Sequence, residues 1–270
     1  MAEHALRYAR VATSFTAENF AVYAHDQYGH GQAVASEDEL GIVPENWFNK
    51  QLEDMNLLIK DLRERHHGKK IFLMGHSMGS FLSQRYFQLY GSQIDGLILS
   101  ATNIKKDPLL GIGITLAAIQ AKLFGSRYRS HLIDKLSFGR FNAAFKPNRT
   151  SHDWLSRNED EVDQYIADAR CGFVCSAVFF RDLFKGVQQA FNEKNIQQIP
   201  RHIPVYAFAG DKDQVGYEGK GFLMLVQKWK AAGVQDLSYH LYKGGRHEML
   251  NELNREEVIG NILTWLKKHL

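Results

Sequence analysis

Cysteine is scarce in this chain of 270 residues, which contains only two. Cys171 and Cys175 lie four positions apart, a spacing that would stack both on one face of a helix rather than bridge them. Two further ligands are missing beside them, so the pattern predicts no zinc site and no other metal. We interpret both as small buried apolar residues of a protein from a reducing compartment.

The chain also lacks an excess of one charge and a long uninterrupted apolar run. Its 33 basic and 30 acidic residues are interspersed and give a net charge of +3, which excludes the basic stripe of a nucleic-acid-binding protein. The N-terminus does not show the charged region and apolar run of a secretory signal. The longest apolar stretch, residues 109–123, is too broken to span a bilayer, because it contains Gly111, Gly113, Thr115, Gln120 and Lys122. We therefore expect a cytoplasmic globular protein with no nucleic-acid partner.

What the sequence does contain is an alternation of apolar strand-like runs with helical patterns. Its length and its hydrophobic content of 44% suffice for the core of one large α/β domain. A helix is predicted over residues 4–17, with Asn19 in the left-handed position that ends it. Strands are predicted, with helices between them, over residues 20–24, 71–74, 94–100, 203–209 and 237–242. Such an alternation predicts a mostly parallel, doubly wound sheet.

The alternation stops between residues 101 and 200. This stretch holds helical runs and a mixture of aromatic and basic residues, and it contains no clear strand. We interpret residues 101–200 as an inserted helical segment, and residues 1–100 and 201–270 as the α/β core.

The most informative motif is Gly75-His76-Ser77-Met78-Gly79, which follows the predicted strand 71–74 and precedes a helical pattern. A strand, a sharp turn and a helix are the context of a nucleophile elbow, in which a strained serine projects its hydroxyl group. We expect both glycines to be required because strand and helix approach too closely for a Cβ atom.

Polar residues that follow the other strands complete a candidate site, since ligands of such sheets bind beyond the carboxyl ends of the strands. Asp211 and Asp213 follow strand 203–209, and His247 follows strand 237–242. Either aspartate can orient a histidine or cap a turn; we favour Asp213 for the first role and Asp211 for the second. His240 lies inside a strand and is a poorer candidate base. The chain order Ser, Asp, His is that of the α/β-hydrolases, in which histidine takes the serine proton.

With these residues placed, the sequence resembles the monoacylglycerol lipase and lysophospholipase branch of the α/β-hydrolases, the serine aminopeptidase S33 group. The resemblance covers nearly the whole chain, including the inserted segment. Matching motifs are Ala2-Glu3-His4, Arg7-Tyr8, Asp26-Gln27-Tyr28-Gly29-His30-Gly31, Gly75 to Phe81, Gly210 to Asp213, Arg246-His247-Glu248, Arg127-Tyr128-Arg129-Ser130, Phe145 to Thr150, Asp153-Trp154-Leu155-Ser156-Arg157 and Cys171-Gly172-Phe173.

The resemblance implies an α/β-hydrolase fold in which Ser77 is the nucleophile, Asp213 the orienting acid and His247 the base. It implies that residues 101–200 form a cap over an acyl-chain pocket, and that no cofactor is needed. We therefore expect a serine hydrolase that cleaves esters of single-acyl lipids, monoacylglycerol or lysophospholipid. An aminopeptidase-like enzyme, a general carboxylesterase and a catalytically impaired remnant are the alternatives. We interpret His25 and His30 as structural, because their spacing fits no metal site.

One departure from the family pattern concerns the oxyanion hole. The resemblance assigns one oxyanion amide to Met78 and the second to the residue after a His-Gly pair that ends a strand; here that residue is Met1, and the His-Gly pair is absent. Losing one donor costs roughly 10²–10³ in turnover in serine hydrolases. We expect that the 270 residues are a shortened version of a longer protein with additional strands upstream.

The inserted segment carries the features that would select a substrate. Residues 109–123 are apolar enough to line an acyl tunnel or to touch a membrane surface transiently, although packing against the sheet explains them equally well. A phosphate headgroup would suit four basic residues, for which a solvated basic face is the simpler interpretation: Arg127, Arg129, Lys146 and Arg149.

Overall fold

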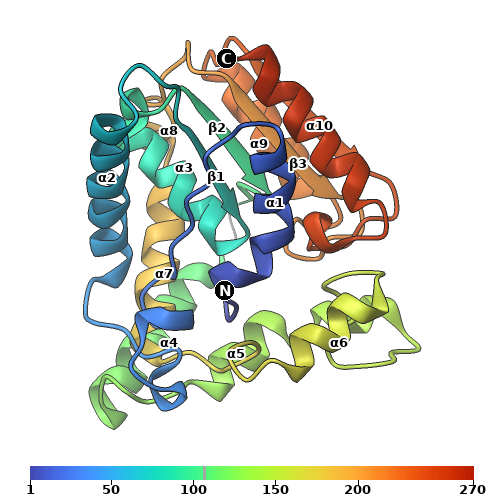
Figure 1. Cartoon of the computed structure of the whole chain (residues 1–270). Helices are drawn as coiled ribbons and strands as arrows, with labels where there is room; N and C mark the ends of the chain where they lie inside the picture. The colour runs from blue at the N-terminus through green and yellow to red at the C-terminus, as the bar shows by residue number, and fades with distance from the viewer. Residues whose placement is uncertain (106–107) are drawn as a thin grey trace.

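A parallel sheet forms the centre of the molecule (Figure 1). The structure is a computed structural model that describes residues 1–105 and 108–270. Within these residues the sheet has four strands in the order β1-β2-β3-β4, and every neighbouring pair is parallel. The strands are β1 (Phe72–His76), β2 (Gly96–Ser100), β3 (Val205–Gly210) and β4 (Leu237–Tyr242). Four of the five predicted strands are therefore present, with boundaries that differ from the prediction by at most two residues.

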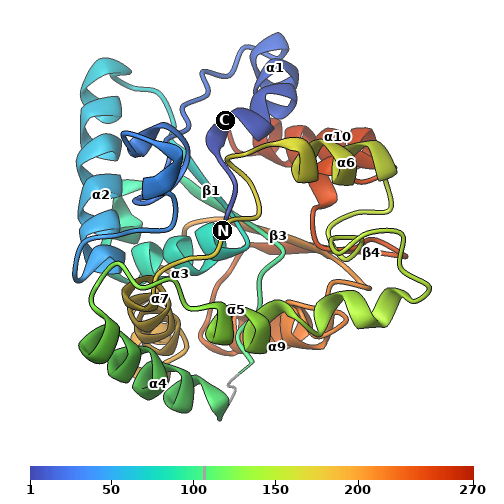
Figure 2. The same cartoon turned by 90° about the horizontal axis from the view of Figure 1, so that it is seen from below.

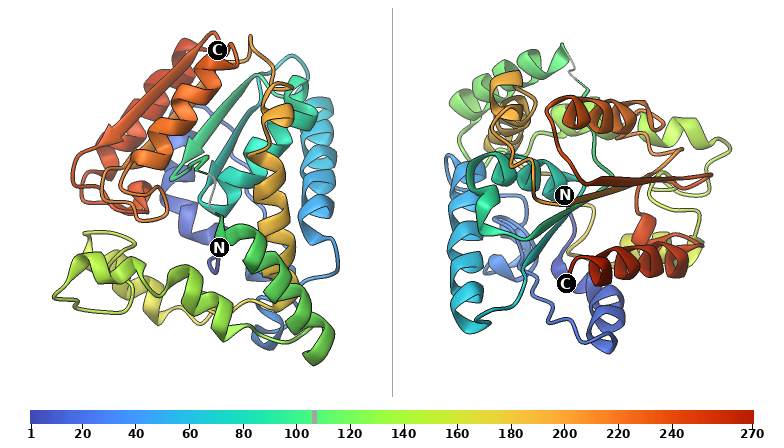
Figure 3. Two further views of the ribbon diagram at one scale, coloured as in Figure 1. Left: turned by 180° about the vertical axis from the view of Figure 1, so that it is seen from behind. Right: turned by 90° about the horizontal axis from the view of Figure 1, so that it is seen from above.

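Helices cover both faces of this sheet, as the doubly wound prediction requires (Figure 3). One face carries α2 (Trp47–Arg65), α3 (Met78–Tyr90), α7 (Ala177–Ala190) and α9 (Lys220–Ala231). The other carries α1 (Ala9–Ala17) and α10 (Arg255–Lys268). Alternate residues of β2 serve the two layers: Leu97 and Leu99 enter the first hydrophobic cluster, and Ile98 enters the second. A strand buried on both faces needs apolar residues at every position, which explains the continuous apolar runs in the sequence.

The described part of segment 101–200 contains several helices, and much of it lies beyond one end of the sheet (Figures 1 and 2). Its helices at that end are α4 (Leu109–Phe124), α5 (His131–Phe138) and α6 (Glu159–Ala167). Its last helices are α7 and α8 (Glu193–Ile196); Phe179 and Leu183 of α7 belong to the same hydrophobic cluster as α2 and α3. The end of the segment therefore packs with the sheet layers rather than beyond them.

Short 3₁₀ helices complete the described elements. They are η1 (Ala5–Tyr8), η2 (Gly31–Ala33), η3 (Glu37–Glu39), η4 (Gly91–Gln93), η5 (Phe141–Phe145) and η6 (Met249–Asn251). The helix predicted over residues 4–17 is η1 followed by α1, and Asn19 has the expected left-handed backbone (φ 65°).

The strand predicted over residues 20–24 is absent, and this prediction was wrong. β1 is an edge strand that pairs with β2, and residues 20–24 pair with no described strand. An apolar run becomes a strand only where its N–H and C=O groups meet a partner backbone. Here Phe20 packs beside Phe15, while Val22 and Tyr23 remain 38% and 49% exposed.

None of the helices in the described part of the chain combines the length and the apolar character needed to cross a bilayer.

The two glycines of the elbow motif differ in how much space surrounds them. A Cβ atom on Gly75 would overlap the backbone of Gly79 and the hydroxyl oxygen of Ser83. A Cβ atom on Gly79 would lie 3.6 Å from the amide nitrogen of Gln27, an ordinary contact. The close approach therefore requires glycine at position 75, and the expectation that Gly79 is needed for the same reason was wrong.

We predict that Gly75→Ala lowers the free energy of unfolding by about 1–3 kcal/mol, because the methyl group would push β1 and α3 apart. The matched change Gly79→Ala should alter it by less than about 1 kcal/mol, since alanine is also the better helix former. Urea unfolding of both variants measures the difference. Equal destabilisation by the two changes would contradict this account of the elbow.

Candidate active site

Ser77 occupies the turn between β1 and α3 with a strained backbone. Its φ of 50° and ψ of −118° are unfavourable for a residue with a Cβ atom. The strain is held by neighbours: the Ser77 N–H donates to the Ser100 carbonyl (3.0 Å), and the Ser80 N–H and hydroxyl donate to the Ser77 carbonyl (2.9 and 2.6 Å). This conformation presents the Ser77 hydroxyl at the carboxyl end of β1.

His247 links Ser77 to Asp213. The loop after β4 places His247 Nε2 2.9 Å from Ser77 Oγ and His247 Nδ1 2.9 Å from Asp213 Oδ1. His247 is 3% exposed and Asp213 is 0% exposed, so water does not compete for the hydrogen bond between them. The structure thus brings together the three side chains that the sequence analysis grouped, over separations of 34 and 170 residues.

The two candidate aspartates have different partners. Asp213 Oδ1 accepts hydrogen bonds from His247 and from the Val215 N–H (2.9 Å), and Oδ2 has no hydrogen-bond partner among the described residues. Asp211 Oδ1 accepts instead from the Gly244 N–H (2.7 Å), in the turn that precedes His247. Asp211 therefore shapes the loop, and Asp213 reaches the imidazole.

Two aromatic rings flank His247, and neither was predicted from the sequence to belong to the site. The centroids of His76 and Trp154 each lie 5.0 Å from that of His247. Burial and the neighbouring His247 lower the pKa of His76 to about 3, so His76 is neutral at physiological pH. His76 was visible inside the elbow motif, whereas nothing local to Trp154 indicates that it reaches a loop 93 residues away. By contrast, His240 lies within β4 and stacks on Tyr242 (4.0 Å).

The two predicted oxyanion donors have different surroundings. Met78 is the first residue of α3, where a backbone N–H has no acceptor within the helix. Met1 is partly buried against the first hydrophobic cluster, and the adjacent Ala2 N–H donates to His30 Nε2 (3.1 Å). The geometry at Met78 is that of an anion-binding helix start; the role of Met1 stays a prediction.

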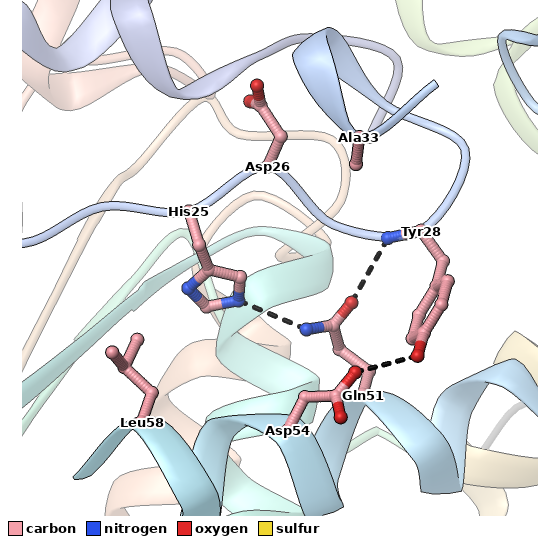
Figure 4. A pocket seen from close by; sticks show the side chains of 7 residues that line it. All are labelled: His25, Asp26, Tyr28, Ala33, Gln51, Asp54 and Leu58. Atoms are coloured by element: carbon pink, nitrogen blue, oxygen red, sulfur yellow. Dashed lines mark hydrogen bonds between the residues drawn. The ribbon is translucent and has the colours of Figure 1, made fainter. Parts of the chain in front are cut away.

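A cavity of about 330 Å³ lies between the segment after α1 and helix α2, and Ser77 is not among the residues that line it (Figure 4). Its polar groups already bond one another: Gln51 accepts from the Tyr28 N–H (3.1 Å) and faces His25, and the Tyr28 hydroxyl donates to Asp54 (2.7 Å). His30 does not line this cavity: its Nδ1 donates to the Tyr28 carbonyl (2.8 Å), and its Nε2 accepts from the Ala2 N–H (3.1 Å). His25 and His30 thus each have a structural partner.

One group in the described chain is compact enough to consider for a metal ion. The ligand atoms of His4, Asp168 and Cys171 lie within 4.8 Å of one another. His4 and Asp168 already share a 2.7 Å hydrogen bond, and burial raises the pKa of Cys171 to about 12, which keeps it a thiol. The prediction that Cys171 and Cys175 share a helix face was wrong: both lie in the loop between α6 and α7, where Gly172 turns the chain (φ 69°).

The basic residues of the inserted segment are mostly engaged within the protein. Arg127 pairs with Glu39 (2.7 Å), and Arg149 pairs with Asp163 (2.7 Å). The Arg129 guanidinium donates to the carbonyl groups of residues Asp38, Leu40 and Val174. These contacts favour a structural role over a headgroup site.

A buried ion pair adjoins His247. Arg7 donates to both oxygens of Glu248 (2.7 Å each), and Asn251 donates to one of them (2.9 Å). Burial opposes ionisation of Glu248, but the Arg7 hydrogen bonds outweigh it and lower the pKa of Glu248 to about 2. The pair ties the N-terminal residues to the loop that carries His247.

Comparisons with known proteins agree with this fold. Residues 1–254 match the family described as serine aminopeptidase, S33. The chain is 26% identical to a monoglyceride lipase of Rattus norvegicus (99% of this chain, 80% of the relative) and 26% identical to a monoacylglycerol lipase of Mycolicibacterium smegmatis (100% and 86%). A crystal structure of a thermostable carboxyl esterase from Bacillus coagulans superposes with a TM-score of 0.89 at 25% identity (99% and 87%).

The low pKa of Glu248 predicts a pH-dependent contribution to stability. Its unperturbed value is 4.5 and its folded value about 2, so the contribution is complete above pH 4.5 and disappears as the pH falls toward 2. At pH 7 we expect Glu248→Gln to lower the free energy of unfolding by about 1.5–3 kcal/mol, because Arg7 keeps its second partner, Glu3. The loss should shrink below pH 4.5.

Urea unfolding at several pH values measures this difference. Glu256→Gln is the matched control, because Glu256 is 77% exposed and pairs loosely with Arg255 (3.6 Å); it should change stability by less than about 0.5 kcal/mol. A Glu248→Gln penalty that stays constant from pH 7 to pH 3 would show that the charge of Glu248 is not responsible.

Proposed function

The chain belongs to the serine aminopeptidase S33 family, and from this premise we propose that it is a serine hydrolase that cleaves the carboxylic ester of a single-acyl lipid. The hydrogen-bond chain from Asp213 through His247 to Ser77 carries the proposal. A serine hydroxyl is too weakly acidic to attack an ester at neutral pH unless a base accepts its proton. The buried imidazole at 2.9 Å is such a base.

The reaction follows from these positions. His247 Nε2 accepts the Ser77 proton while Ser77 Oγ attacks the ester carbonyl, and the Met78 N–H stabilises the oxyanion that forms. His247 then donates the proton to the leaving alcohol, and an acyl-enzyme remains on Ser77. A water molecule, activated by the same imidazole, releases the fatty acid. Asp213 keeps Nδ1 protonated and stabilises the imidazolium that forms in each half-reaction.

The substrate class is supported by the relatives and by the composition of the inserted segment. Similar proteins in a rodent and in a mycobacterium are named as lipases of monoacylglycerol, a small ester with one acyl chain. We take residues 101–200 to include a cap, formed by α4, α5 and α6, that covers the acyl chain. Lysophospholipid carries the same acyl ester and is the second substrate of this class.

Contact with a lipid surface would supply such substrates, and α4 is the helix suited to it. Ile112, Ile119, Leu123 and Phe124 of α4 are between 50% and 68% exposed. An exposed apolar patch of this kind on one helix is unusual unless it meets another surface. We infer a transient contact between α4 and the membrane or aggregate that holds the lipid.

We predict that Asp213→Asn lowers kcat for monoacylglycerol by about 10⁴, because the imidazole would adopt the wrong tautomer. The matched change Asp211→Asn should leave kcat within about twofold, since the asparagine oxygen still accepts from the Gly244 N–H. Release of fatty acid from monoacylglycerol is the measurement for both.

Lysophosphatidylcholine and an amino-acid p-nitroanilide are compared under the same conditions. Equal losses in the Asp211 and Asp213 variants would contradict the assignment of the acid. Preference for the anilide over both lipid esters would contradict the lipid substrate and support an aminopeptidase, and the absence of turnover in folded protein would support an impaired remnant.

We also predict that Ile112→Ser combined with Leu123→Ser weakens partitioning onto phosphatidylcholine vesicles by at least about tenfold. The contact would lose two aliphatic side chains that enter the lipid. Leu57→Ser on α2 is the control, since Leu57 and Ile112 are both 63% exposed. Vesicle sedimentation measures the partitioning. Equal effects of the two sets of changes would exclude α4 as the contact.

A further inference from the structure

We propose that Glu252 and residues 153–157 position His247, so that the inserted segment and the loop of the proposed base move as one unit. The proposal rests on the function proposed above. Residues 153–157 precede α6 and lie along the loop that follows β4. Glu252 is a positioning residue in this scheme, because it touches neither Ser77 nor the imidazole.

The two segments are joined first through their backbones. The His247 N–H donates to the Trp154 carbonyl (3.4 Å), and the Glu248 N–H donates to the Leu155 carbonyl (2.7 Å). The Ser156 hydroxyl donates to the Asn251 carbonyl (2.9 Å). The chain from His247 to Asn251 is therefore bonded to the inserted segment.

Glu252 forms the second and stronger connection. Its carboxylate is fully buried and accepts four hydrogen bonds. The donors are the backbone N–H groups of Arg246 (2.9 Å), Arg157 (3.1 Å) and the adjacent Leu253 (3.0 Å), and the side-chain Nε of Arg157 (2.9 Å). One oxygen bridges Arg246 and Arg157, and these residues come from the two different segments. Because Arg246 directly precedes His247, this oxygen fixes the backbone from which the imidazole projects.

Arg246 completes the connection in the opposite direction. Its guanidinium donates to the carbonyl groups of Asp153 and Ser156, and it lies over the ring of Phe145 (4.3 Å from the centroid). The loop of His247 is thus bonded to the inserted segment both through its backbone N–H groups and through the side chain of Arg246.

The cost of separating the two segments makes the coupling strong. If residues 153–157 moved away, the Glu252 carboxylate would lose the only ion pair that it forms in the described chain, the one with Arg157. The Arg246 N–H would then donate to a carboxylate whose position is no longer fixed by Arg157. A displacement of the imidazole by about 1 Å is enough to cost roughly 10²-fold in rate.

The test compares two buried carboxylates of similar setting. Glu252→Gln keeps the shape of the side chain. It replaces one carboxylate oxygen, which accepts from two N–H groups, by an amide nitrogen that cannot accept a hydrogen bond. Glu161→Gln is the matched control: Glu161 is 7% exposed and joins α6 to α1 and α10 through Arg10 (2.5 Å) and Arg255 (3.0 Å), without touching the His247 loop. For Glu252→Gln we expect kcat to fall about 10- to 100-fold, with KM changed less than about threefold. Glu161→Gln should leave kcat within about twofold, since it acts on stability alone.

A spectroscopic readout separates this proposal from the proposed function. The low-field proton NMR signal of His247 Nδ1–H reports the bond to Asp213 whether or not the protein cleaves an ester. We expect it to shift or broaden in Glu252→Gln and to stay in place in Glu161→Gln. If Glu252→Gln does not fold, Arg157→Lys, which keeps the Glu252 charge and the backbone bonds, should shift the signal in the same direction by less.

Wild-type protein that shows the signal but no turnover would contradict the proposed function alone. A Glu252→Gln variant whose signal and kcat match those of Glu161→Gln would overturn the positioning role.

Discussion

The hydrogen bond between Asp213 and His247 is the interaction on which the site depends. Both groups are buried, so the bond is not weakened by water, and the imidazole is left with one free nitrogen that points at Ser77. The sheet supplies the framework: β1, β3 and β4 are parallel, and their carboxyl ends bring the three loops together. At the strained turn of Ser77, the glycine at position 75 allows β1 and α3 to approach each other closely.

Three acidic side chains are buried around this one histidine, and each has a different partner. Asp213 faces the imidazole, Glu248 is paired with Arg7, and Glu252 is paired with Arg157. Burying an unpaired carboxylate is costly, so each pair constrains the segments that provide its partners. The N-terminal residues and the inserted segment are thereby tied to the loop of His247. The apolar core holds the layers together, whereas these ion pairs determine where the loop lies.

The sequence predicted what is encoded locally and missed what is not. The elbow, the order of strands and helices, and Asp213 with His247 follow from short motifs after apolar runs. The strand over residues 20–24 was wrong because strand formation depends on a neighbouring backbone, which no local pattern reveals. The Trp154 and Arg157 contacts to the His247 loop escaped notice because they join residues 93 and 95 positions apart. The helical spacing assumed for Cys171 and Cys175 ignored the turn at Gly172.

The most direct test of the central claim is the site of covalent modification by a fluorophosphonate, mapped by peptide mass spectrometry on the native chain. The reagent phosphonylates a serine only when a neighbouring base activates its hydroxyl. We expect one adduct, on the peptide that contains Ser77, and none after His247→Ala. Folded protein that stays unmodified, or that carries the adduct on another serine, would contradict the claim that Asp213 and His247 activate Ser77.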